Sequence, residues 1–212
     1  MYISMGECVF LNKGVPFENV VRIGAHHGEE GKDYLQSGVK SVIWVEALKK
    51  FMSSLYDNTK SLNLKQKYIN ACLSDVSNEK ITFNIANNGQ SSSMLNLGTH
   101  SSLHPQVSYV DHIELTTQRF EDIAVKENID VHSINFVNLD VQGAELKVLK
   151  GFGDILSCKN IKAIYTEINF EHVYENCCLA NELDSYLGNY SFKRVKTKGE
   201  IRQWGDALYL RA

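Results

Sequence analysis

The sequence predicts an α/β fold with a mostly parallel central sheet, helices on both faces of that sheet and an antiparallel hairpin at the C-terminal end. Short apolar runs rich in β-branched residues alternate with segments of helical periodicity, which is typical of a parallel sheet covered on both sides. The last two apolar runs have no helix between them, so we expect them to pair. The 212 residues can bury a core without disulfides or metals. No linker divides them, and we expect one domain over residues 1–212, either complete in itself or part of a longer chain.

The N-terminal half of the chain alternates strands with helices. Gly38 is expected to end the first helix. In the second helix, Phe51, Met52, Leu55 and Tyr56 recur at helical spacing and form the expected inner face. The predicted elements are a strand at 19–25, a helix at 29–37, a strand at 41–47, a helix at 49–61, and strands at 68–73 and 80–86.

The C-terminal half begins with a polar stretch, 87–110, that we interpret as a lid or binding loop because long irregular segments in compact domains usually have such roles. Thr117 is the expected N-cap of the helix that follows. The predicted elements are a strand at 112–116, a helix at 117–128, a strand at 134–141, a helix at 144–156 interrupted near two glycines, a strand at 161–168, a helix at 181–187, and strands at 192–197 and 206–210.

Composition and charge exclude several classes of protein. The chain is 43% hydrophobic and 22% charged with a net charge of -3, so we expect a globular protein without a nucleic-acid partner. Its one basic cluster, at 193–198, is interpreted as a solvated strand face. No apolar run approaches the roughly 20 residues of a membrane span. The five cysteines are an odd number without zinc-ligand spacing, which favours reduced thiols and a cytoplasmic location.

The strongest local motif is Arg-Ile-Gly-Ala-His-His-Gly at 22–28, between the first strand and its helix. A nucleotide-like ligand requires a tight turn at this place, so that backbone amides can approach it. We therefore expect Gly24, Ala25, His26 and Gly28 to contact a cofactor.

An acidic residue ends the second predicted strand. Glu46 follows Gly24 by 22 residues, close to the roughly 20-residue interval at which an acid meets ribose hydroxyls in such folds. We expect Glu46 and the adjacent Ala47 to bind the ribose. The alternative is that Glu46 only caps the strand end.

A third motif, Asn-Leu-Asp-Val-Gln-Gly-Ala-Glu at 138–145, lies where a central strand passes into a helix. Ligands of open α/β sheets bind beyond the carboxyl ends of the strands, so Asp140 is expected to face the same crevice as Gly24. Glu145 could contact a ligand or instead pair with the helix N-terminus.

These motifs, in their order and spacing, resemble the FkbM family of methyltransferases. That family shows Asp-x-Gly-Ala-Asn-x-Gly, an acid after the second strand, a serine-rich segment, and Asp-Val-Glu-Gly-x-Glu before a helix. The corresponding segments here are 22–28, Glu46, 90–93 and 140–145. The similarity runs from about Val20 to Glu167. It implies a Rossmann-like class I methyltransferase fold, with S-adenosylmethionine as cofactor and S-adenosylhomocysteine as product.

The resemblance also implies an acceptor and an adenine site. FkbM-like enzymes are associated with O-methylation of sugars, so the expected acceptor is a hydroxyl of a sugar or glycoconjugate. The chain would then be fused to glycosyltransferases or work with them. Ser74 and Asp75 match the place where such enzymes meet the adenine, although a plain turn is an equal alternative.

Two residues depart from the family pattern. Arg22 stands where the family has an acid that helps to hold the methionine end of the cofactor, and Gln142 stands where the family has Glu. The second change could alter substrate or metal contacts. His26 in place of Asn is milder, because both side chains form local hydrogen bonds.

Methyl transfer to a hydroxyl requires a group that removes the proton. The candidate catalytic residues are Asp140, which we rank first, Glu167 and His172. A divalent metal held by Asp140 and Glu167 stays open, since their spacing alone does not establish one. The residues expected to contact the acceptor are Ser92, Ser93, His104, Gln142 and Glu145.

Other functions stay open at this point. A methyltransferase acting on RNA or on a small metabolite would share the cofactor fold. A nucleotide-dependent oxidoreductase fits the strand order, but His26 interrupts its glycine pattern. A non-catalytic cofactor-binding domain would explain why Arg22 and Gln142 both fall at motif positions. Against it, Gly24 and Gly28 are present together with the three motif acids, Glu46, Asp140 and Glu145.

Overall fold

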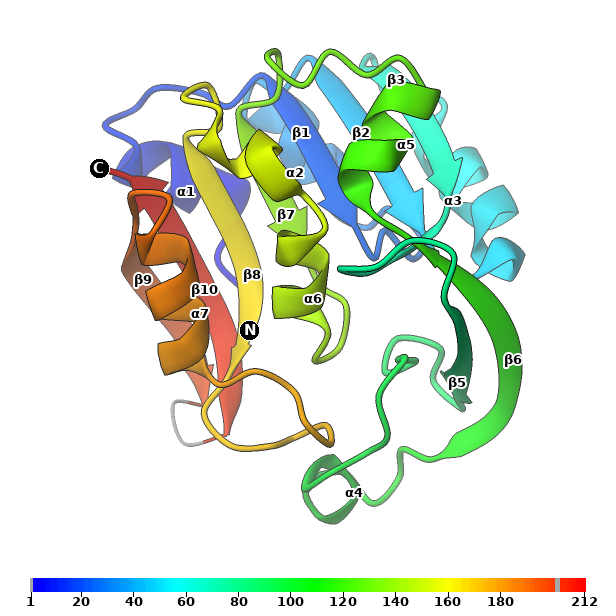
Figure 1. The fold of residues 1–212 in the computed structure, drawn as a ribbon. Coiled ribbons are helices and arrows are strands. Elements are labelled where there is room, and N and C mark those ends of the chain that lie inside the picture. Colours follow the sequence, from blue (N-terminus) through cyan, green and yellow to red (C-terminus); the bar gives the residue numbers. More distant parts are fainter. Residues whose placement is uncertain (1, 201–202) are drawn as a thin grey trace.

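A seven-stranded sheet forms the centre of the molecule, in the order β3-β2-β1-β7-β8-β10-β9 (Figure 1). The computed structural model describes residues 2–200 and 203–212. The five neighbouring strands β3, β2, β1, β7 and β8 are parallel, and β10 is antiparallel to both β8 and β9. Their bounds are β1 Asn19–Ile23, β2 Ser41–Glu46, β3 Lys65–Asn70, β7 Phe136–Leu139, β8 Ala163–Asn169, β9 Phe192–Glu200 and β10 Trp204–Arg211. The predicted parallel sheet and closing hairpin are therefore confirmed.

Both faces of this sheet are buried under helices. Because successive residues of a strand point to opposite sides, each strand contributes to the core on both faces. In β1, Val20 belongs to one apolar cluster and Val21 to the other. The helices α1 (Met5–Leu11), α2 (Gly31–Gln36) and α3 (Met52–Thr59) pack on the face of Val20, with the short 3-10 turn η1 (Lys49–Phe51) before α3. The opposite face is covered by α5 (Phe120–Lys126), α6 (Glu145–Lys150), the 3-10 turn η2 (Gly153–Ser157) and α7 (Ala180–Gly188).

A smaller sheet lies beside the carboxyl ends of the parallel strands (Figure 1). It has the order β4-β6-β5, formed by Cys72–Leu73, Tyr109–Gln118 and Lys80–Ala86. The polar segment between β5 and β6 contains one short helix, α4 (His100–Leu103). The predicted strand at 80–86 is confirmed.

The strand order reverses between β1 and β7, since β2 and β3 lie on one side of this pair and β8 and β10 on the other. In open α/β sheets, such a switch point creates a crevice at the carboxyl ends of the strands. The glycine motif after β1 and the Asp140 motif after β7 both begin at this point.

The predicted N-cap at Thr117 is wrong. Thr117 is fully buried inside β6, where it pairs with Cys72 and its hydroxyl donates to the Val76 carbonyl at 2.7 Å. The helix α5 begins at Phe120, after Arg119 in extended conformation. Thr117 is β-branched, which favours the extended conformation of a strand. Its pairing with β4 lies outside the local sequence pattern, so the prediction ended the strand too early.

Three other details differ from the prediction. Tyr56 is 52% exposed, so Leu55 and not Tyr56 is the buried member of that pair on α3. The expected strand at 68–73 is divided, with β3 ending at Asn70 and Cys72 belonging to the small sheet. The helix α1 was not predicted; it begins with a capping box in which Ser4 and Glu7 exchange hydrogen bonds.

Candidate functional site

A cavity of about 640 Å³ lies at the switch point, within the range typical of small-molecule sites. Its wall is formed by residues at the carboxyl ends of β1, β2, β7 and β8 and by the segment between β5 and β6. Among the residues predicted from sequence, those on the wall are Gly24, His26, Glu46, Ala47, Ser92, His104, Asp140, Gln142 and Glu167.

The glycine turn after β1 brings two strand ends together. Gly24 has φ +73°, and a Cβ there would meet the Asp140 carbonyl at 1.9 Å, so only glycine allows this approach. Gly28 has φ +75° and packs against Leu55 of α3, outside the cavity wall. Ala25 is also outside the wall, fully buried in the core on the α3 side. Ala25 and Gly28 therefore support the glycine turn from the core side and do not line the cavity.

Glu46 ties the end of β2 to the glycine turn. Its two carboxylate oxygens accept hydrogen bonds from the backbone amides of His26 and Leu48, each at 2.8 Å. Burial raises the pKa of Glu46, and the two backbone donors oppose that rise. The carboxylate is thus held in place on the cavity wall by groups of the chain itself.

An apolar wall adjoins Glu46, and the sequence analysis did not identify it. It is formed by side chains from η1, from the segment after β3 and from β5: Leu48, Phe51, Cys72, Leu73 and Phe83. A carboxylate beside an apolar slot suits a flat ring attached to a hydroxylated sugar. A sequence signal existed, because 47–51 and 71–73 directly follow strands two and three.

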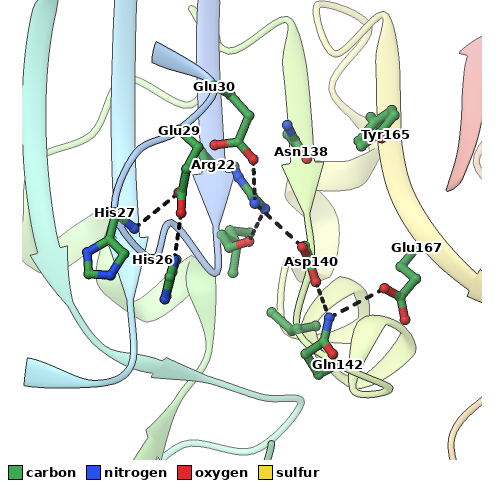
Figure 2. Close-up of polar contacts among 12 residues, drawn as sticks. Arg22, His26, His27, Glu29, Glu30, Asn138, Asp140, Gln142, Tyr165 and Glu167 are labelled. Carbon is green, nitrogen blue, oxygen red and sulfur yellow. Dashed lines mark hydrogen bonds and ion pairs between the residues drawn. The ribbon is translucent and has the colours of Figure 1, made fainter. Parts of the chain in front are cut away.

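The charge of Arg22, the first residue of the glycine motif, is paired within the cavity wall. Its guanidinium contacts Glu30 at 2.6 Å, donates to the Ile23 carbonyl at 2.9 Å and lies 3.7 Å from Asp140 (Figure 2). Burial lowers the pKa of Arg22, but the carboxylates of Glu30 and Asp140 outweigh it and raise the pKa overall. The sequence analysis missed Glu30, which supplies the compensating charge.

Gln142 bridges two carboxyl groups on the cavity wall (Figure 2). Its amide nitrogen donates to Asp140 at 2.6 Å and to Glu167 at 3.4 Å. Its amide oxygen accepts from the Tyr174 hydroxyl, and its backbone carbonyl accepts from Ser93. The backbone of Gln142 also has a positive φ of +53°, which is uncommon for residues other than glycine. The turn after β7 is therefore held from several sides.

Glu167 lies near the carboxyl end of β8, a strand buried along its whole length, and is 8% exposed. Burial raises its pKa well above the ordinary value, and Asp140, Glu145 and Asp206 raise it further. A carboxyl group in such surroundings holds a proton readily, which is the property that a general base requires.

Some predicted residues lie away from the cavity. Glu145 is fully buried, and one of its oxygens accepts from the amides of Val141 and Gly143, so it braces the turn before α6. Burial raises the pKa of Glu145 to about 7. Ser93 is fully buried and is a brace for Gln142.

Three further predicted residues are also outside the wall. Ser74 donates to Asp75 at 3.0 Å in a turn after β4, which is the plain-turn alternative. His172 is exposed, and its imidazole contacts the Cys177 carbonyl at 3.1 Å. By contrast, His104 does reach the wall, where it packs against His100.

Within residues 2–200 and 203–212, no group of three or more His, Cys, Asp or Glu side chains is arranged to hold a metal ion. In the same part of the chain, none of the helices is both long and apolar enough to span a bilayer.

Comparison with solved structures supports the class of fold. The methyltransferase domain of a bacterial Hen1 protein superposes with a TM-score of 0.54 at 9% identity, over 98% of this chain and 96% of that one. A methyltransferase dependent on S-adenosylmethionine from Aquifex aeolicus gives 0.51 at 11% identity, over 99% and 91%. Magnesium protoporphyrin IX methyltransferase from Synechocystis PCC 6803, with the cofactor bound, gives 0.51 at 10% identity, over 97% and 75%. The fold is that of a Rossmann-like class I methyltransferase.

Sequence comparison identifies the family. No curated protein sequence matches the chain. The profile of the methyltransferase FkbM domain matches residues 22–194, from Arg22 of β1 to Arg194 of β9, and so includes the glycine turn, Glu46, Asp140 and Glu167. The chain therefore belongs to the FkbM family of methyltransferases and uses S-adenosylmethionine as its cofactor.

Proposed function

We propose that the protein transfers the methyl group of S-adenosylmethionine to a hydroxyl of a sugar or glycoconjugate. The observation that carries this proposal is the position of Glu167, a buried carboxyl group of raised pKa beside Asp140 on the cavity wall. A hydroxyl is a poor nucleophile until its proton is removed, so a site for O-methylation needs a base of this kind.

The residues on the wall fit the cofactor. Glu46 would accept hydrogen bonds from the ribose hydroxyls, and the apolar side chains of Leu48, Phe51 and Leu73 would pack on the adenine. Asp140 would lie toward the cationic methionine end, which follows from its place beside Gly24. When bound, the cofactor supplies a methyl group on a positively charged sulfur, which is open to in-line displacement.

The remaining work of the protein is to position the acceptor and to receive its proton. Glu167 would accept the hydroxyl proton on a carboxylate oxygen, while the Gln142 amide keeps that carboxyl oriented. Tyr174 would restrain Gln142 in turn through the amide oxygen. The proposal assigns the proton to Glu167 and not to His172, because His172 is exposed and outside the cavity wall.

The acceptor class is supported by aromatic residues of the same wall. Tyr165, Tyr174 and Trp204 offer aromatic surface beside carboxyl groups, a combination that suits a hydroxylated ring. Ser92 and His104 lie on the wall from the segment between β5 and β6. All five cysteines are described and free, which supports a cytoplasmic location. Action beside glycosyltransferases remains what the family resemblance implies.

The first experiment is calorimetric titration with S-adenosylmethionine and S-adenosylhomocysteine. We expect micromolar binding that Glu46→Gln weakens at least tenfold, while Glu114→Gln, an exposed acid on β6, leaves it unchanged. Absence of binding by the folded wild-type protein would refute the assignment of this cavity to the cofactor.

The second experiment tests the acceptor with the radiolabelled methyl donor. Transfer to sugars that Glu167→Gln reduces at least a hundredfold, without loss of cofactor affinity, supports the proposed base. Transfer to RNA and not to any sugar would overturn the acceptor class.

A further inference from the structure

The carboxyl groups on the cavity wall fall into two sets according to their partners. Seven acidic side chains line the cavity: Glu29, Glu30, Asp33, Glu46, Asp140, Glu167 and Asp206. In each of the first five, a carboxylate oxygen lies 2.8 Å or less from a partner group. The partners are His26 for Glu29, Arg22 for Glu30, the Met5 amide for Asp33, the His26 and Leu48 amides for Glu46, and Gln142 for Asp140. Glu167 and Asp206 have no contact of that strength with the residues that the structure describes.

These two acids face each other across neighbouring strands. Glu167 of β8 and Asp206 of β10 are direct partners in the antiparallel register, so their side chains leave the same face of the sheet. Like charges placed opposite each other repel. Glu167 has only the long contact to Gln142 at 3.4 Å, and Asp206 has the Tyr165 hydroxyl as its neighbouring donor.

The described cations nearest to this pair are already engaged: Lys198 of β9, the register partner of Asp206, contacts Glu7 at 3.3 Å. In the described part of the chain, Arg22 is the only lysine or arginine on the cavity wall, and its guanidinium is already engaged by Glu30 and the Ile23 carbonyl. Burial and the charge of Asp140 raise the pKa of Asp206 to about 6. Glu167 and Asp206 therefore have only cations that other carboxylates already hold, whereas buried carboxylates normally have a counter-charge of their own.

An independent observation on the same face also calls for a donor. Asn138 of β7 is 5% exposed, lines the cavity and lies between Arg22 and Tyr165 in the strand register (Figure 2). Its amide nitrogen donates to the Tyr34 hydroxyl, but its amide oxygen finds no donor among residues 2–200 and 203–212. Buried acceptors without donors are rare, and one that lines a cavity is explained by a donor on the ligand.

We propose that Asp206, together with Glu167, binds a protonated amine of the acceptor, so that the methylated hydroxyl belongs to an amine-bearing sugar. This inference rests on the proposed function and narrows its substrate class. The ammonium supplies a counter-charge for the pair and donors for the acceptors on this face, and the ring of Trp204 on the same wall offers it an aromatic surface. With the amine bound, repulsion between the two carboxylates is relieved, and Glu167 can ionise and receive the hydroxyl proton.

The test uses sugars that differ only in this charge: glucosamine, glucose and N-acetylglucosamine, and the aminoglycoside neamine beside its N-acetylated form. Each is titrated into the protein saturated with S-adenosylhomocysteine, at pH 7 and low salt, by calorimetry or saturation-transfer NMR. We expect each free amine to bind at least tenfold more tightly than its neutral counterparts, and the preference to shrink as salt is added.

Two variants make the result specific. Asp206→Asn should abolish the preference for the amine while cofactor affinity is retained, and Asp111→Asn, an exposed acid on β6, should preserve it. Equal affinity for charged and neutral sugars, or a preference that survives Asp206→Asn, overturns the inference and leaves the proposed function standing. Binding of none of the five sugars by cofactor-loaded protein also overturns it. Failure to bind the cofactor would instead strike at the proposed function.

Discussion

The guanidinium of Arg22 contacts the Glu30 carboxylate at 2.6 Å within the wall of the cavity at the switch point. Arg22 comes from β1, and Glu30 is the residue before α2, so the ion pair fastens α2 to β1. Because the side chain of Arg22 is only 5% exposed, the pair has little access to solvent on its cationic side. This pairing explains how a cation is accommodated within the glycine motif.

Removal of one member of this pair should destabilise the protein. We expect Arg22→Met to lower the free energy of unfolding by about 3 kcal/mol, because it leaves the Glu30 carboxylate without its cation. Arg22→Met combined with Glu30→Gln should recover most of that loss. Urea denaturation measures both variants. Additive losses in the double variant would show that the two side chains are not coupled.

The pH dependence of stability should reveal Asp206. Its pKa is raised from 3.8 to about 6, first by burial and then by Asp140, so the folded protein binds a proton more tightly there than the unfolded chain does. The stability that this group contributes is present in full below pH 3.8 and is lost as the pH rises through about 6. We therefore expect wild-type protein to lose stability relative to Asp206→Asn between about pH 4 and 7 in urea titrations. A constant difference between the two proteins would contradict the raised pKa.

Gln142 should control the base without contacting the cofactor's methyl group. Gln142→Glu places another carboxylate beside Asp140 and Glu167, which raises the pKa of Glu167 further. The rising limb of the pH profile of methyl transfer should move to higher pH, with kcat about tenfold lower at pH 7. Tyr174→Phe should lower kcat less, because it removes only the donor to the Gln142 oxygen. An unchanged pH profile in Gln142→Glu would show that the amide does not position Glu167.

The N-terminal helix should depend on its cap. The Ser4 hydroxyl accepts from the Glu7 amide, and the Glu7 carboxylate accepts from the Ser4 amide at 3.1 Å. Ser4→Ala should therefore lower the free energy of unfolding by about 1 kcal/mol. The exposed Ser61 provides a matched control, for which we expect no change in calorimetric or urea unfolding. Equal effects of both substitutions would mean that the cap contributes nothing.

Elements that depend on local pattern could be predicted from the sequence. Period-two burial and β-branched runs placed the strands of both halves, including Lys80–Ala86, because these signals lie within a few neighbouring residues. The same is true of the places of the glycine turn and of Glu46, which follow from the positions of the strand ends. Thr117 was misplaced because its conformation depends on Cys72, 45 residues earlier in the chain.

The matching of acidic and cationic groups depends on the folded arrangement and could not be predicted from the sequence. The pairing of Arg22 with Glu30, and the opposition of Glu167 and Asp206, arise from strand order and register. No local pattern reports that Asp206, near the end of the chain, lies opposite Glu167. The energy of a charge depends on its neighbours and burial, and folding brings those neighbours from distant parts of the sequence.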